Sequence, residues 1–106
     1  MDWIKIFSSQ AEMEMALVPG QPRLLIVQGK RICIVRREEI IYAVADKCPH
    51  SGESLSKGSV NYLGEIVCPL HGQRFSLKNG REGEERSRDL LTYPVKQDQE
   101  GVYIGL

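Results

Sequence analysis

The sequence predicts an all-β fold, an antiparallel β-sandwich or small barrel, and three observations lead to it. Short runs of β-branched and aromatic residues recur along the chain, separated by turn residues. No long stretch has the 3.6-residue apolar period of a helix, and no repeat or linker interrupts the pattern. A chain of 106 residues buries one core, so we expect a single domain over residues 1–106.

The first 45 residues predict four strands and one short helix. Residues 3–7, Trp-Ile-Lys-Ile-Phe, are aromatic or β-branched around a single lysine and predict a first strand. Ser9 stands three residues before Glu12, a capping arrangement that predicts a short helix within 8–16. Pro19 and Gly20 should stop that helix. The other strands are a hairpin of 24–27 and 32–35 around a turn at 28–30, and a strand at 40–45 after the charged turn 36–39.

The second half predicts shorter strands and longer loops. Residues 51–64 are small, polar and rich in turn formers. Lys78-Asn79-Gly80 is a turn signal, and a charged connector follows it at 81–89. The expected strands are 65–67, 74–77 and a final hairpin of 90–96 with 102–104.

Two matched loops hold the residues most suited to chemistry. The first reads Cys48-Pro49-His50-Ser51-Gly52 and the second reads Cys68-Pro69-Leu70-His71-Gly72, with seventeen residues between His50 and Cys68. They contain both histidines of the chain and two of its three cysteines. Each loop therefore offers one thiolate and one imidazole, as expected for two facing loops that hold one metal centre.

The pattern C-x-H-x17-C-x2-H resembles the ligand pattern of Rieske [2Fe-2S] proteins. In that family two cysteines hold one iron and two histidines hold the other. The resemblance thus implies a [2Fe-2S] cluster bound by Cys48 with Cys68 and by His50 with His71. It also implies a Rieske-like fold, with a small cluster-binding subdomain at about 46–77 formed by the two loops. The similarity continues around Gly80, Tyr93-Pro94-Val95 and Val102-Tyr103.

A structural zinc site is the alternative use of the same four residues. Two cysteines and two histidines are a common tetrahedral zinc set. Zinc fingers usually place both cysteines on one arm and both histidines on the other, whereas each arm here has one of each. This order favours the iron–sulfur interpretation, and zinc stays open.

The departures of this sequence from the respiratory branch of the family predict a potential at the low end of the Rieske range. Two neutral imidazoles in place of thiolates raise the potential above that of an all-cysteine cluster, and it should fall as pH rises past the histidine pKa of the oxidised state. The respiratory branch of the family adds a disulfide between the loops, at positions that are Glu53 and Leu70 here. It also places hydroxyl donors where this chain has Gln73 and Phe75. We therefore expect a potential nearer about −150 mV than +300 mV.

The predicted function is one-electron transfer from a reductase to a terminal oxygenase of the aromatic-ring dioxygenase type. An oxygenase of this kind needs a second iron with two more histidines, and a reductase needs a G-x-G-x-x-G nucleotide-binding unit. The chain has neither, so we expect no catalytic residue and no small-molecule substrate site. The alternative is a tightly bound small subunit of a larger oxidoreductase, such as nitrite reductase.

Charge and hydropathy exclude several other partners. Fourteen basic residues balance fourteen acidic ones, which argues against nucleic acid or an anionic membrane surface. No apolar run approaches the roughly 20 residues of a membrane helix, and no signal peptide is evident, so we expect a cytoplasmic protein.

Cys33 lies between two isoleucines and should be a buried thiol. The connector 81–89 lacks the proline that shields the cluster in similar ferredoxins.

Overall fold

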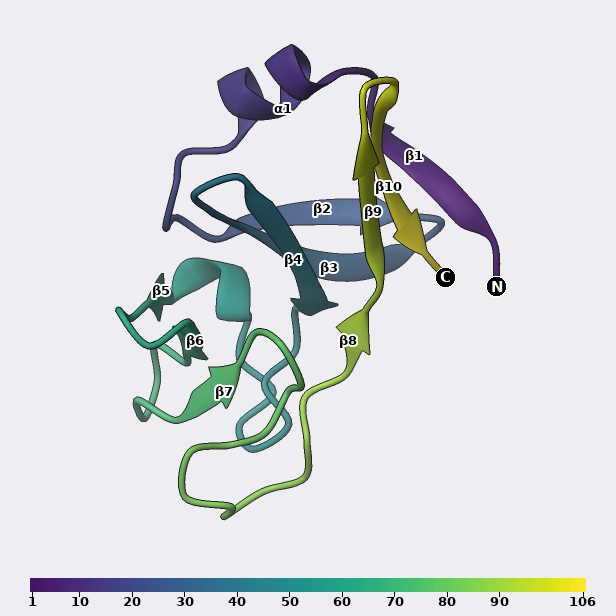
Figure 1. Ribbon diagram of the computed structural model, residues 1–106. Helices are drawn as coiled ribbons and strands as arrows, with labels where there is room; N and C mark the ends of the chain where they lie inside the picture. Colours follow the sequence, from purple (N-terminus) through teal and green to yellow (C-terminus); the bar gives the residue numbers. More distant parts are fainter.

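The computed structural model describes residues 1–106 as three antiparallel sheets with one short α-helix (Figure 1). The first sheet has the strand order β1 (Trp3–Phe7), β10 (Gly101–Gly105), β9 (Val95–Asp98). The second has the order β2 (Arg23–Val27), β3 (Lys30–Arg37), β4 (Ile40–Ala45), β8 (Thr92–Tyr93). The third has the order β5 (Ser59–Val60), β6 (Glu65–Val67), β7 (Arg74–Ser76), and the 3-10 turn η1 (Leu55–Lys57) precedes it. The all-β antiparallel class predicted from the sequence is confirmed.

Strand β3 is buried on both faces and divides the core in two. Ile32 and Ile34 point into a cluster between the first two sheets, with Phe7, Met13, Leu17, Val102 and Ile104. Cys33 and Val35, which alternate with them along β3, point into a second cluster with Leu55, Ile66, Phe75, Leu77 and Leu90. A strand covered on both sides has no reason to alternate apolar and polar residues, which explains the continuous apolar run. The second sheet is therefore the common wall between the first sheet and the part of the chain that contains the two loops.

The short helix α1 (Gln10–Ala16) begins as its capping residues predict. The backbone N–H of Glu12 donates to Ser9 Oγ at 3.0 Å. The Glu12 carboxylate reaches back to the backbone N–H and the hydroxyl of Ser8, one residue beyond a standard capping box. These bonds hold the pKa of Glu12 below its usual range. The helix is far too short to cross a membrane, and no other helix of the structure could do so.

Two expectations for the later strands need correction. The run 90–96 is not one strand, because the chain changes sheets at Pro94: β8 pairs with β4, and β9 pairs with β10. Proline has no N–H for either ladder, so the break falls there. The segment 51–64, predicted to be rich in turns and without a strand, contains η1 and also β5, the first strand of the third sheet.

The Gln97 side chain joins the first and second sheets. Its Oε1 accepts the backbone N–H of Ile41 at 3.0 Å, and its Nε2 donates to the Glu39 carbonyl at 3.0 Å. The side-chain amide of Gln97, on β9 of the first sheet, thus continues the hydrogen bonding of β4 in the second sheet. Together with the apolar cluster it fixes β9 against the start of β4.

Both ends of the chain lie on the same side of the molecule (Figure 1). Asp2 and Leu106 exchange two backbone hydrogen bonds, each 3.0 Å, and extend the β1–β10 ladder. The third sheet and the connector between β7 and β8 occupy the other end, away from α1 and from the termini.

Candidate metal centre

The two predicted loops have the same backbone conformation. In the first, Cys48 N–H donates to the Glu53 carbonyl at 2.9 Å and Gly52 N–H donates to the Cys48 carbonyl at 2.8 Å. The second repeats both bonds, from Cys68 to Gln73 at 2.8 Å and from Gly72 to Cys68 at 3.0 Å. The glycines have φ of 78° and 73°, a region that favours residues without Cβ. The matched sequence motifs therefore fold into matched turns, and each glycine is required by its turn.

The loops bring the four predicted residues together in two pairs, a thiol pair and an imidazole pair. Cys48 and Cys68 are 1% and 2% exposed and lie in the same buried cluster, and Cys68 is among the groups that lower the pKa of Cys48. His50 and His71 are exposed, with ring centroids 5.8 Å apart and ring planes at 76°. No three histidine, cysteine or carboxylate side chains converge as one metal ion needs. Two pairs fit a centre with two metal ions better than they fit one tetrahedral zinc ion.

Hydrogen-bond donors surround the thiol pair. Burial raises the pKa of Cys48, but the hydroxyl of Ser51 and the backbone N–H groups of Ser51 and His50 oppose it, and the net pKa lies below the ordinary value. Ser51 Oγ also lies 3.4 Å from Cys68 Sγ. These donors shift Cys48 toward the thiolate, the form of cysteine that binds metal. Ser51 was missed in the sequence, where a serine before a glycine has the character of an ordinary turn residue.

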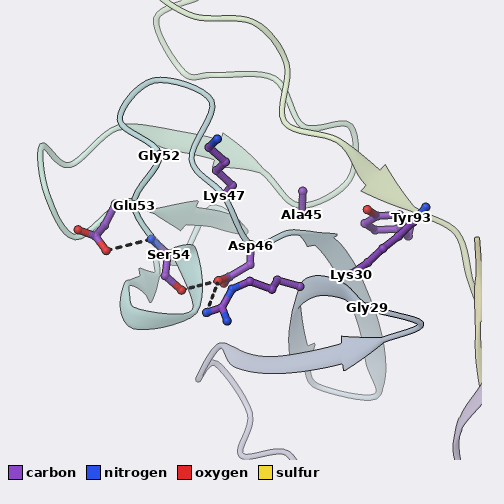
Figure 2. Close-up of a pocket in the computed structure, with 10 residues that line it drawn as sticks. Gly29, Lys30, Ala45, Asp46, Lys47, Gly52, Glu53, Ser54 and Tyr93 are labelled. Atoms are coloured by element: carbon purple, nitrogen blue, oxygen red, sulfur yellow. Dashed lines mark hydrogen bonds and ion pairs between the residues drawn. The ribbon is translucent and has the colours of Figure 1, made fainter.

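The buried carboxylate of Asp46 stabilises the first loop and lines the pocket drawn in Figure 2. Asp46 is 2% exposed and precedes the loop at the end of β4. Its side chain accepts hydrogen bonds from the Ser54 hydroxyl and from the Ser56 backbone N–H, the latter at 2.8 Å. Its backbone carbonyl accepts Leu55 N–H at 2.6 Å, and Arg31 lies 3.6 Å from the carboxylate. Asp46 therefore ties the outgoing and returning arms of the loop together.

The proline-free connector is ordered by a second buried carboxylate, Glu82. It accepts the backbone N–H of Glu84 and of Arg86, and Arg86 Nε lies 3.0 Å from its Oε1. The bonds from Glu84 and Arg86 hold the pKa of Glu82 below its usual range against the opposing effect of desolvation. Gly83 N–H donates to the Arg74 carbonyl at 2.8 Å and fastens the connector to β7. The charged connector 81–89 is therefore organised around the buried carboxylate of Glu82.

The donor set fits an iron–sulfur cluster. It supplies two thiols with N–H and O–H donors around them, and two accessible imidazoles. Gln73, directly after the second loop, is buried and its Oε1 has no hydrogen-bond partner. That oxygen is an acceptor and needs a donor, which the sulfurs of a cluster do not supply, so the fit rests on the thiols, the donors around them and the imidazoles.

Comparisons with known proteins agree with this geometry. The family described as Rieske-like [2Fe-2S] domain matches residues 2–105. The ferredoxin component of the naphthalene 1,2-dioxygenase system of Pseudomonas aeruginosa is 36% identical over 81 residues, which are 76% of this chain and 77% of the relative. The 3-phenylpropionate/cinnamic acid dioxygenase ferredoxin subunit of Shigella boydii is 36% identical over 66 residues, 61% of this chain and only 62% of that relative.

Solved structures show the same fold. The ferredoxin of carbazole 1,9a-dioxygenase from Nocardioides aromaticivorans superimposes with a TM-score of 0.82 at 24% identity, covering 98% of this chain and 97% of its own. A protein described as the small subunit of a nitrite reductase (NADPH) gives 0.81 at 24% identity, with 100% of both chains covered. A complex of oxygenase and ferredoxin in carbazole 1,9a-dioxygenase gives 0.79 at 26% identity, covering 96% of this chain and 91% of that one. With this fold, these paired loops and a family match over nearly its whole length, the chain belongs to the Rieske-like [2Fe-2S] domain family.

Proposed function

We propose that this protein is a one-electron carrier whose [2Fe-2S] cluster is held by Cys48 and Cys68 on one iron and by His50 and His71 on the other. The observation behind the proposal is the separation of the two pairs, with both thiols buried and both imidazoles exposed. When bound, such a cluster takes up and releases one electron. The buried thiols exclude water from one side of the centre, and the imidazoles present the other side to a partner.

The proposed partners are a reductase that supplies the electron and a terminal oxygenase that receives it. The relatives at 36% identity are ferredoxin components of dioxygenase systems, and one similar chain was solved in a complex with its oxygenase. The proposed location is the cytoplasm, where reducing conditions keep thiols available to iron. The proposed potential is low in the Rieske range, because Gln73 and Phe75 offer no hydroxyl at the positions after the second loop.

The ligand assignment is tested by metal analysis of the purified protein and of two variants. Wild type should contain iron and acid-labile sulfide in equal amounts, and Cys68→Ser should lose both, because one iron would lack a thiolate. Cys33→Ser is the matched control: its thiol is also buried but lies on β3, outside the two loops. Zinc without sulfide in the wild type would refute the proposal.

The carrier function is tested by voltammetry as a function of pH. Wild type should give one reversible wave at low potential that falls as the histidines lose protons, since a reduced centre holds those protons more tightly. A wave that does not depend on pH between about 6 and 11 would contradict histidine ligation.

A bound subunit of a larger oxidoreductase is the second candidate function. Its support is the match to the nitrite reductase small subunit, which covers the full length of both chains. Size-exclusion chromatography with multi-angle light scattering distinguishes the two functions. A free carrier should elute as a stable monomer at micromolar concentration, whereas a dedicated subunit should co-purify with its large partner from the native source.

A further inference from the structure

Ser51 lies where the two loops meet. It belongs to the first loop, and its Oγ is 3.4 Å from the sulfur of Cys68 in the second loop. The same oxygen accepts the backbone N–H of Glu53 at 3.2 Å. Ser51 is half-buried, and Cys68 is almost completely buried. This hydroxyl therefore joins a residue of one loop to a metal-binding thiol of the other.

The chemistry of the two groups fixes the direction of the bond. A hydroxyl has one hydrogen to donate and two lone pairs that accept. The Glu53 N–H occupies one lone pair, which leaves the hydroxyl hydrogen for a sulfur of the thiol pair, and Cys68 Sγ lies 3.4 Å from the hydroxyl. A cysteine that holds iron is a thiolate and has no hydrogen to give. Ser51 must therefore be the donor and Cys68 Sγ the acceptor.

We propose that Ser51 donates an O–H hydrogen bond across the two loops to the Cys68 sulfur and thereby raises the reduction potential of the centre. The inference rests on the proposed function, in which Cys68 is an iron ligand. It places the tuning hydroxyl in the first loop, whereas positions 73 and 75 after the second loop hold glutamine and phenylalanine. Ser51 acts through Cys68 and is a positioning residue.

The direction of the effect follows from charge. One electron supplied by an external donor makes the Cys68 sulfur more negative, and a donor hydrogen bond to a more negative acceptor is stronger. The hydrogen stays on Ser51, so no proton moves with the electron. Because Cys68 is 2% exposed, water screens the bond little, and the reduced state gains more from it than the oxidised state.

The test is the midpoint potential of three variants, measured by spectroelectrochemistry at several pH values. Ser51→Ala should lower the equilibrium constant for reduction three- to tenfold, or about 30–60 mV for a one-electron couple. Its curve of potential against pH should run parallel to that of the wild type, because the histidines are unchanged. Ser51→Thr keeps the hydroxyl and should restore most of the potential. Ser59→Ala removes an exposed hydroxyl from β5 and should change nothing.

The outcomes distinguish a failure of this inference from a failure of the proposed function. A wild type without iron and sulfide would overturn both. A Ser51→Ala variant with a full complement of iron and sulfide and an unchanged potential would overturn the inference alone. If Ser51→Ala fails to retain iron, Ser51→Gly removes the same hydroxyl without adding an apolar group, and an unchanged potential there would also overturn it.

Discussion

Replacing Asp46 with asparagine should loosen the first loop and accelerate loss of the bound metal. The carboxylate is 2% exposed and accepts hydrogen bonds from the Ser54 hydroxyl and the Ser56 N–H. Asparagine has nearly the same size, so packing is retained. The asparagine side chain is neutral. Its NH2 group is a donor and would face the Ser54 hydroxyl or the Ser56 N–H, which are donors themselves.

The magnitude follows from the change of charge. Hydrogen bonds to a charged group contribute about 1.5–3 kcal/mol, and those between neutral groups about 0.5–1.5 kcal/mol. Two bonds that each weaken by about 1 kcal/mol destabilise the closed loop by about 2 kcal/mol. Arg31 adds little, because its side chain is 57% exposed and water screens the ion pair. Since 1.4 kcal/mol is tenfold, the open loop should be populated roughly 30-fold more often.

The assay is the decay of visible absorption in excess iron chelator at pH 7. Release of metal needs local opening of the loop, so the rate should rise with the open population, roughly 30-fold for Asp46→Asn. Asp98→Asn is the matched control, because that carboxylate accepts one backbone N–H in the exposed turn after β9. A rate for Asp46→Asn within about twofold of both wild type and control would refute this account of the loop.

Three further predictions concern groups outside the metal-binding residues. Gln97→Leu should lower the free energy of unfolding by about 1–3 kcal/mol in urea denaturation, because the buried N–H of Ile41 loses its acceptor, and it should leave the potential unchanged. Glu82 has a lowered pKa, so its contribution to stability is present above the pKa of a free glutamate and is lost as pH falls through the folded value. The difference in melting temperature between wild type and Glu82→Gln should accordingly be largest near pH 7 and shrink below about pH 4, and an equal difference at both pH values would contradict it. Burial raises the pKa of Cys33 to about 12, so iodoacetamide at pH 8 should alkylate Cys33 only after unfolding, as mass spectrometry of the labelled peptide would detect.

The sequence predicted the elements whose signals are local. The hairpin of β2 and β3 follows from its apolar runs and turn residues, and the two loops follow from repeated ligand motifs. Pro94 divides two strands because they pair with β4 and β10, partners distant in sequence, and no local pattern contains that information. β5 is two residues long and gives no periodic signal of its own.

The buried polar groups were the hardest to foresee. Glu82 stands in a run of charges that predicts a solvated loop, yet its carboxylate organises the connector because three donors surround it. Ser51 has the composition of a turn, and its proximity to Cys68 exists only after the two loops fold against each other. Such roles depend on tertiary contacts. Neither the residue type nor its neighbours in sequence distinguish an ordinary turn residue from one with a structural role.

The pairing of Asp2 with Leu106 has a practical consequence for engineering. Both ends emerge together beside β1 and β10, on the side of the molecule remote from the third sheet and the connector (Figure 1). A tether or a fused enzyme attached at either end would therefore start away from the third sheet, whose β6–β7 connection contains His71. Immobilised through such a tag, the protein could face an electrode or a partner in a defined orientation, with the length of the tether setting how often the two meet.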